Sequence, residues 1–120
     1  MNAVLSIKPE YVREIIAGHK CYEYRTKVFS QSVEKVYIYA SSPVSKVVGE
    51  FYPVNILIGR PADIWQMTKA YSGITEQLFE EYFEGRKVAY AISIQNLKIY
   101  DIPKTLPFRA PQSYRYIETL

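Results

Sequence analysis

The sequence is poor in the residues that build disulfides, metal centres and membrane spans. Among its 120 residues there is one cysteine, Cys21, and one histidine, His19. A single cysteine forms no disulfide within the chain, and a structural zinc site would lack ligands. No apolar stretch is long enough to cross a bilayer as a helix. We therefore expect no metal, no cofactor and no membrane partner.

The first residues also lack the features of a secretory signal. Residues 1–3 lead directly into the strand-like segment 4–7, with no basic region and no long apolar run. A lone cysteine is typical of a reducing compartment. Together these observations predict a cytoplasmic location.

What the chain does contain is typical of one globular domain. Hydrophobic residues make up 48% and charged residues 22% of the sequence, which excludes a disordered or coiled-coil chain. A chain of this length buries a core without disulfides or metals. We expect a single domain over residues 1–120. Tyrosine is the one unusual component, with twelve copies.

The net charge of +3 is unevenly distributed along the chain. Residues 63–84 contain five acidic side chains and one lysine, a net charge of −4, so the other residues together carry +7. A basic body favours a polyanion such as nucleic acid. The alternative interpretation is that the charge only keeps the protein soluble.

Hydrophobic periodicity predicts five or six strands and three short helices. The first helix begins at Pro9, where a missing N–H costs nothing, and ends at Gly18. The other two predicted helices cover residues 61–70 and 75–84. The predicted strands cover residues 4–7, 22–25, 34–40, 46–58, 86–100 and 114–117.

The two long predicted strands indicate a bent sheet. Gly49 and Pro53 interrupt the first of them, which favours a bulge or the sharp bend that turns the corner of a small barrel. No alternation of strand, helix and parallel strand recurs. We therefore predict an α+β fold, a small closed β-barrel of five to six mostly antiparallel strands with short helices on its outside. The helices near residues 61–85 form an insert in this barrel.

One charged segment stands out between the first helix and the second strand. Residues 18–25 follow the pattern G-x-K-x-x-E-x-R, and strand alternation places Glu23 and Arg25 on one face. An arginine binds phosphate or carboxylate through two hydrogen bonds, a lysine adds a mobile charge, and a glutamate accepts from a base amino group. Lys20, Glu23 and Arg25 are therefore the predicted ligand-binding residues. The alternative is an ordinary ion pair at the rim of a sheet.

Three further polar residues are candidates for the rim of the same cleft. Ser41 follows the strand that ends at Ala40, and Gln112 and Arg115 lie in an extended tail that contains proline. Hydroxyl, amide and guanidinium groups in such positions can donate to a ligand. Their alternative roles are a turn-forming serine and the polar edge of a closing strand.

Tyrosine pairs with a spacing of two provide another candidate surface. The two rings of each pair share a strand face, and such a face can stack bases. For any single pair we favour the alternative, in which the ring fills the core and the hydroxyl stays in water. The pairs are Tyr22 with Tyr24, Tyr37 with Tyr39, and Tyr114 with Tyr116.

The charged segment resembles a known family. Its G-x-K-x-x-E-x-R pattern, preceded by an apolar strand and a helix opened by Lys-Pro, is similar to the ASCH family, a PUA-like β-barrel. The resemblance extends to residues 6–9, 37–42, 48–51 and 89–94. It implies a cleft beside the first helix, lined by Lys20, Glu23 and Arg25, that binds RNA or modified nucleosides.

The resemblance also raises an enzymatic alternative. Some members of the wider family hydrolyse acylated nucleosides with a lysine, a threonine and a glutamate, and other relatives are ribonucleases. Lys20 matches the lysine, but Glu23 stands where the threonine is expected and Thr26 is out of register. Ribonuclease action needs a base for the ribose hydroxyl and a cation for the phosphate, roles open to Lys20 and Arg25.

Three functions are therefore considered. The first is binding of RNA or a nucleotide-like ligand in a basic cleft, in RNA metabolism or in the regulation of transcription or translation. The second is an enzyme on the same scaffold, a nucleoside amidohydrolase or a ribonuclease with Lys20 as its catalytic group. The third is an adaptor that binds proteins through the acidic helices in residues 63–84. Glu23 favours the first, because a carboxylate beside Lys20 raises the lysine pKa and keeps it charged.

Overall fold

The computed structural model describes residues 1–120, which form eight strands, three α-helices and one 3-10 turn. The strands are β1 (Asn2–Ile7), β2 (Tyr22–Arg25), β3 (Val36–Ala40), β4 (Lys46–Tyr52), β5 (Ile56–Gly59), β6 (Ala89–Ser93), β7 (Gln95–Lys104) and β8 (Tyr114–Ile117). The helical elements are α1 (Pro9–Ile16), α2 (Pro61–Thr68), η1 (Lys69–Tyr71) and α3 (Glu76–Tyr82). None of these helices has the length and apolar character needed to span a membrane.

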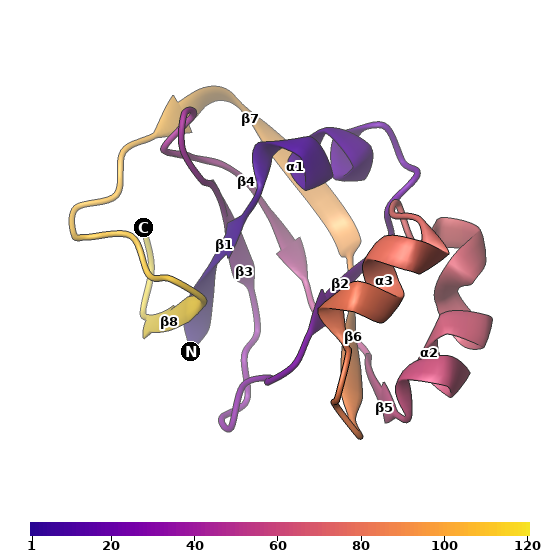
Figure 1. Ribbon diagram of the computed structural model, residues 1–120. Coiled ribbons are helices and arrows are strands. Elements are labelled where there is room, and N and C mark those ends of the chain that lie inside the picture. The colour runs from indigo at the N-terminus through magenta and orange to yellow at the C-terminus, as the bar shows by residue number, and fades with distance from the viewer.

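The strands pair into two sheets (Figure 1). One has five strands in the order β7-β4-β3-β1-β8, and the other has three in the order β2-β6-β5. Only β1 and β3 pair in parallel, and every other pair is antiparallel. The predicted α+β class and the mostly antiparallel pairing are therefore confirmed. The structure departs from the predicted closed barrel of five to six strands, because its eight strands form two sheets that hydrogen bonds do not join into a ring.

The additional strands come from the two long β segments. The segment predicted over 46–58 divides at Pro53 into β4 and β5, and the segment predicted over 86–100 divides after Ser93 into β6 and β7. In each case the first and second halves belong to different sheets. Asn96 adopts a left-handed φ of 52° just after the second division. The predicted bend is therefore a change of sheet, and two such changes connect the sheets at one corner.

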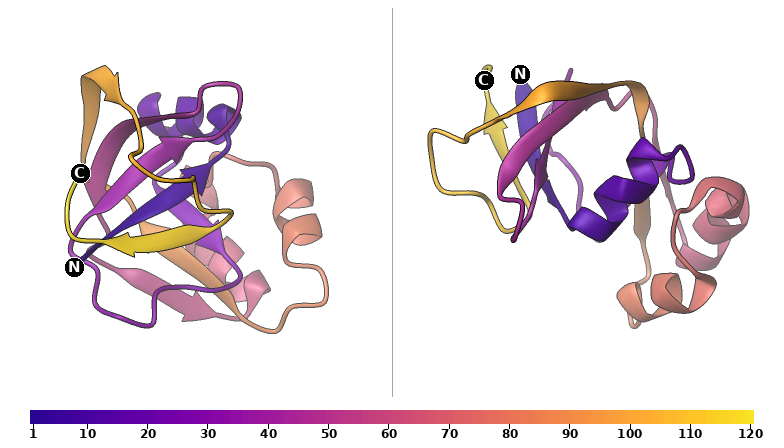
Figure 2. Two further views of the ribbon diagram at one scale, coloured as in Figure 1. Left: turned by 90° about the vertical axis from the view of Figure 1, so that its left-hand side faces the viewer. Right: turned by 90° about the horizontal axis from the view of Figure 1, so that it is seen from above.

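Three apolar clusters hold these layers together. The largest has nine buried residues, comes from both sheets and α1, and includes Leu5, Ile38, Phe51 and Ile92. A second cluster joins the three-stranded sheet to α2 and α3, and a third is covered in part by the C-terminal tail. Figure 2 shows α1 lying between the five-stranded sheet and the pair α2 and α3. This arrangement leaves the end of α1 beside β2 and the helical segment.

Helix α1 forms for the reasons that its sequence indicates. Pro9 occupies the first turn, and Val12 and Ile15 are buried on the face that packs on the core. Gly18 has a φ of +83°, a conformation that favours glycine, and it ends the helical segment. The chain then reaches β2 within four residues. The predicted helix boundaries are confirmed. They place Lys20 in the short connection between α1 and β2.

Helices α2 and α3 lie within residues 61–85 and pack on the three-stranded sheet. Ile64 on α2 and Phe79 on α3 are buried in the same cluster as Tyr24 from β2. The rings of Tyr24 and Phe79 meet edge to face with centroids 4.9 Å apart. At the start of α3, the Leu78 N–H donates to the Thr75 hydroxyl over 3.2 Å, which caps the helix. The loop between these helices lies beside the residues that lead into β2, where the Cys21 N–H donates to the Tyr71 carbonyl.

Candidate functional site

A cavity of about 510 Å³ opens between α1, β2, α3 and the C-terminal tail. Its polar lining residues are Ser6, Lys8, Lys20, Glu23, Arg25, Ser41, Gln112 and Ser113. Its aromatic and aliphatic walls include Tyr11, Ile74, Leu78 and Tyr82. Five of the six predicted site residues therefore line one cavity.

Arg115 is the predicted site residue that the structure places elsewhere. It lies on β8 opposite Val4, whose side chain packs in the cluster on the outer side of the five-stranded sheet. The Arg115 guanidinium carbon lies 3.8 Å from the centroid of the Phe108 ring. The register of β8 therefore turns Arg115 away from the cavity. The prediction that Arg115 lies at the cavity rim is wrong, and its side chain packs on Phe108.

Strand β2 supplies the acidic group of the cavity. Glu23 pairs in register with Ile92 of β6, so both side chains lie on the face that looks toward the core between the sheets. Glu23 is only 6% exposed. On the opposite face, the Tyr24 hydroxyl lies 2.7 Å from the Thr68 hydroxyl, and burial raises the pKa of Tyr24 to about 12. The alternation predicted for β2 is therefore the one found.

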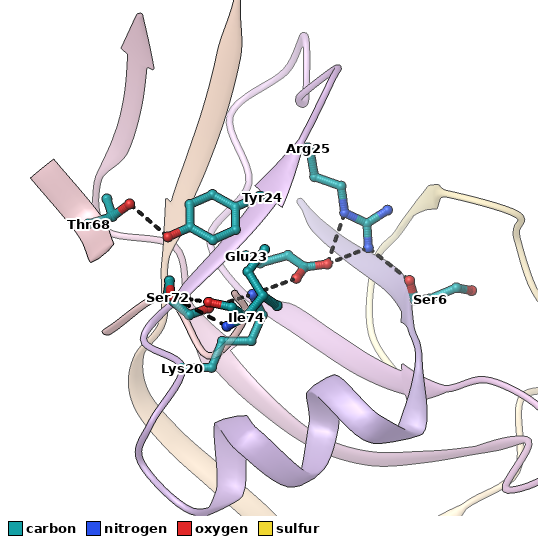
Figure 3. Close-up of polar contacts among 8 residues, drawn as sticks. All are labelled: Ser6, Lys20, Glu23, Tyr24, Arg25, Thr68, Ser72 and Ile74. Carbon is teal, nitrogen blue, oxygen red and sulfur yellow. Dashed lines mark hydrogen bonds and ion pairs between the residues drawn. The ribbon is translucent and has the colours of Figure 1, made fainter. Parts of the chain in front are cut away.

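The Arg25 guanidinium is largely engaged by the protein itself (Figure 3). Its Nε and Nη2 both donate to Oε2 of Glu23, over 3.0 and 2.8 Å. Nη2 also donates to the Ser6 carbonyl over 2.8 Å, and Nη1 donates to the Ser113 hydroxyl over 3.3 Å. Four contacts from five N–H groups leave little for a ligand. Arg25 thus fixes Glu23 and ties β2 to β1 and to the tail.

Lys20 is the most deeply buried charged group of the site, at 2% exposure. Its Nζ donates to the Ser72 carbonyl over 3.2 Å and lies 3.9 Å from Oε1 of Glu23. The Tyr11 and Tyr24 rings lie under the ammonium, with centroids 5.4 and 4.7 Å from Nζ. Figure 3 shows Lys20 between the Ser72 loop and Glu23.

The environment of Lys20 lowers its pKa. Burial is the largest cause, Glu23 acts in the opposite direction, and Arg25 adds a further lowering. Glu23 therefore raises the pKa of Lys20 as the sequence predicts, but the effect of burial is larger and the net shift is downward. The carboxylate is shared with Arg25 and stands 3.9 Å from Nζ, so it does not offset the loss of hydration.

The loop between η1 and α3 supports Lys20 and was missed by sequence reasoning. The Cys21 N–H donates to the Tyr71 carbonyl over 2.9 Å, next to the bond from Lys20 to Ser72. Gly73 has a φ of +65°, and a Cβ at this position would collide with the Cβ of Lys20. The Ser-Gly dipeptide was a visible signal of a turn, but nothing local links it to Lys20.

The arrangement provides a buried amine whose pKa is lowered by burial, a carboxylate oxygen with no hydrogen bond of its own, and hydroxyls at the cavity wall. Oε1 of Glu23 has only the distant Lys20 as a neighbour, because Arg25 uses Oε2. No group of three or more His, Cys, Asp and Glu side chains is arranged to hold a metal ion. The chemistry that the residues offer directly is anion binding, base recognition and proton transfer.

Comparison with known proteins identifies the family. The sequence model of the ASCH domain matches residues 5–98. This chain belongs to the ASCH domain family. The ASCH domain described here is 30% identical over 96 residues to a protein of Zymomonas mobilis subsp. mobilis named "ASCH domain-containing ribonuclease". That match covers 79% of this chain and 65% of the relative.

Two further matches extend the comparison. A "Large ribosomal subunit protein uL22" of Ureaplasma parvum serovar 3 is 31% identical over 90 residues, which cover 72% of this chain and 29% of that protein. The crystal structure of ASCH from Zymomonas mobilis superposes with a TM-score of 0.88 and 28% identity. It covers 98% of this chain and 87% of the compared chain. The similarity in structure therefore includes the helices in residues 61–85 and the C-terminal tail.

Proposed function

We propose that this ASCH domain binds RNA or a nucleotide-like ligand in the cavity between α1, β2 and α3. The observation that supports this most strongly is the buried amine of Lys20 on the cavity wall. An ammonium has three donors, and the protein provides Lys20 with one hydrogen bond, to the Ser72 carbonyl. A phosphate oxygen would supply the missing acceptors and the missing negative charge.

The rest of the cavity suits the other parts of a nucleotide. A volume of about 510 Å³ lies within the range of small-ligand sites, which combine apolar walls with a few placed polar groups. The rings of Tyr11 and Tyr82 are surfaces for a base, and the free Oε1 of Glu23 is an acceptor for an amino or hydroxyl group. Lys8 at the wall adds a second cation. The name of the Zymomonas relative supports RNA as the source of the nucleotide.

Fluorescence anisotropy with labelled short RNAs tests the proposal. We expect salt-dependent binding that Lys20→Met weakens about ten- to hundredfold, because a hydrogen bond to a charged group is lost. Lys35→Met is the matched control, since it removes one lysine charge from a residue that does not line the cavity and is paired with Glu50. Its binding should stay within about threefold of wild type. Absent binding, or equal losses in both variants, would contradict the proposal.

The lowered pKa of Lys20 favours a second candidate function, cleavage of the bound RNA. When Lys20 is deprotonated, its amine can accept the proton of a ribose 2′-hydroxyl, whose oxygen then attacks the adjacent phosphorus. The 5′-oxygen is displaced and leaves as a hydroxyl, with a proton returned by Lys20 or supplied by water. The cation of Lys8 would stabilise the charge on the phosphate. The expected products are fragments with a 2′,3′-cyclic phosphate, formed by wild type and absent with Lys20→Met.

The same assay separates this reaction from amide hydrolysis. Glu23 occupies the position where acylated-nucleoside hydrolases carry a threonine, so we expect acylated cytidine to stay intact. Wild-type cleavage of acylated cytidine that Lys20→Met abolishes would reverse that assignment. RNA cleavage that persists in Lys20→Met would remove Lys20 from the reaction.

A further inference from the structure

A second cavity adjoins the first at the end of α1. It has a volume of about 560 Å³ and lies between the end of that helix and the loop from η1 to α3. The two cavities share three lining residues, Tyr11, Ile74 and Leu78. A ligand seated at Lys20 can therefore extend past these three residues into the second cavity.

Two exposed aromatic rings characterise this second cavity. The Tyr71 residue is 57% exposed and the side chain of His19 is 70% exposed, although both line the cavity. Neither ring belongs to an apolar cluster of the fold. Rings that do not serve the core and stand beside a proposed nucleotide site are suited to stacking on a base.

The polar groups of the second cavity are compatible with a phosphodiester chain. Its one carboxylate, Glu14, accepts a hydrogen bond from Nδ1 of His19 over 2.8 Å, so one of its oxygens is already engaged. Nε2 of His19 has no protein partner and is free for a ligand. Lys69 also lines the cavity and supplies a cation. Its Nζ donates to the Gln66 side chain over 2.9 Å, which leaves two further donors.

Two hydrogen bonds to backbone carbonyls hold the wall between the cavities. The Cys21 N–H donates to the Tyr71 carbonyl over 2.9 Å, and Lys20 Nζ donates to the Ser72 carbonyl over 3.2 Å. These two hydrogen bonds join the segment that contains the buried amine, residues 20–21, to the segment that contains the exposed ring, residues 71–72. Their relative position is set before any ligand arrives, which reduces the cost of binding at both places.

We propose that the second cavity binds the nucleotide next to the one held at Lys20. The preferred ligand is then a single-stranded RNA of two or more nucleotides, and a free nucleoside or mononucleotide fills only half of the site. Tyr71 and His19 stack on the second base, and Lys69 neutralises the phosphate that follows it. This inference rests on the proposed function, because the second nucleotide is placed relative to a first nucleotide bound at Lys20.

Isothermal titration calorimetry with two probes tests the second cavity. The probes are a mixed-sequence hexanucleotide RNA and an equimolar mixture of the four nucleoside 5′-monophosphates. We expect Tyr71→Ala to weaken hexanucleotide binding at least about fivefold, since a stacked base is lost, and to leave mononucleotide binding within about twofold of wild type. Ile102→Ala, which alters an 82% exposed residue on β7, is the control and should change neither.

The outcomes separate the two proposals. If Tyr71→Ala binds the hexanucleotide as wild type does, or loses affinity for both probes equally, the proposal that the second cavity binds a nucleotide is contradicted. The proposal of a ligand site at Lys20 is not affected by that result. If Lys20→Met binds both probes as wild type does, the proposed ligand site at Lys20 is contradicted. The proposal for the second cavity is then contradicted too, because it rests on that site. A hexanucleotide that binds wild type no more tightly than the mononucleotides also overturns the second cavity.

Discussion

Two lysine–glutamate pairs in this domain consist of the same residue types and behave in opposite ways. Lys20 and Glu23 lie 3.9 Å apart with side chains 2% and 7% exposed. Lys35 and Glu50 lie 3.1 Å apart with side chains 26% and 14% exposed. The pKa of Lys20 is lowered, chiefly by burial, whereas the hydrogen bond to Glu50 raises the pKa of Lys35.

The difference lies in what else each carboxylate binds. Oε2 of Glu50 is the partner of Lys35, and Oε1 accepts from the Tyr100 hydroxyl over 2.7 Å, so this pair is complete within the protein. In the other pair, Arg25 takes Oε2 of Glu23 and leaves Lys20 without a close carboxylate. A lysine that is buried and incompletely paired beside a cavity is available to a ligand. The Lys35–Glu50 pair, in contrast, has its partners within the protein and only joins neighbouring segments of the sheet.

The largest expected effect comes from removing the two carboxylates in turn. Glu23→Gln leaves Lys20 and Arg25 next to each other without a buried counter-charge, so we expect a loss of about 3 kcal/mol in the free energy of unfolding. Glu50→Gln removes a pair that water reaches, and we expect a loss of no more than about 1 kcal/mol. Urea denaturation of both variants measures the difference. Equal losses would show that the two pairs do not differ in this way.

A smaller effect is expected from the glycine that supports Lys20. Gly73→Ala places a methyl group against the Lys20 side chain at a φ of +65°, so we expect a loss of about 2 kcal/mol together with weaker RNA binding. Gly85→Ala is the matched control. Its φ is +75°, but nothing lies within 4 Å of the added methyl group.

The control fixes how the glycine result is interpreted. Gly85→Ala should lose about 1 kcal/mol from backbone strain alone and bind RNA as wild type does. Thermal unfolding and RNA anisotropy on both variants provide the comparison. If Gly73→Ala binds RNA normally, the loop does not position Lys20 for the ligand.

The pH dependence of stability gives the smallest effect, with opposite signs for the two lysines. Unfolded Lys20 keeps its proton up to its ordinary pKa of 10.5, whereas folded Lys20 releases it at lower pH. Between those values the unfolded state binds more protons, so the stability of wild type relative to Lys20→Met rises with pH, by at most about 1.4 kcal/mol per unit.

Lys35 should behave in the reverse manner. Its folded pKa is raised, so its contribution is fully present below 10.5 and is lost as the pH rises through the folded value. The stability of wild type relative to Lys35→Met should therefore decline with rising pH in that window. Urea denaturation across the alkaline range checks both signs, and parallel curves for the two variants would contradict the assignment.

Local signals in the sequence were sufficient for much of the fold and for half of the site. Pro9 and Gly18 delimited α1, and alternation along β2 placed Glu23 and Arg25 together on one face. The two changes of sheet were predicted only as bends. Whether a strand that breaks at Pro53 stays in its sheet depends on the partners it then finds, which local periodicity does not specify.

The burial of Lys20 and the position of Arg115 were beyond sequence reasoning for a related cause. Lys20 is covered by Ser72, which is 52 positions away in the chain. The orientation of Arg115 follows from the register of β8 on β1, and a shift of one residue would reverse it. A protein partner for the acidic helices in residues 63–84 stays a prediction, to be tested by pull-downs after charge reversal at Glu80 and Glu84.

The most direct test of the site is a nuclear magnetic resonance titration of the lysine side chains, with and without a short RNA. Carbon-13 labelling at lysine Cε reports the pKa of Lys20 and Lys35 in the same sample. We predict that Lys20 titrates below 10.5 and below Lys35 in the free protein. We also predict that added RNA raises the pKa of Lys20 and leaves that of Lys35 unchanged. A Lys20 pKa at or above 10.5 that RNA does not move would contradict the account.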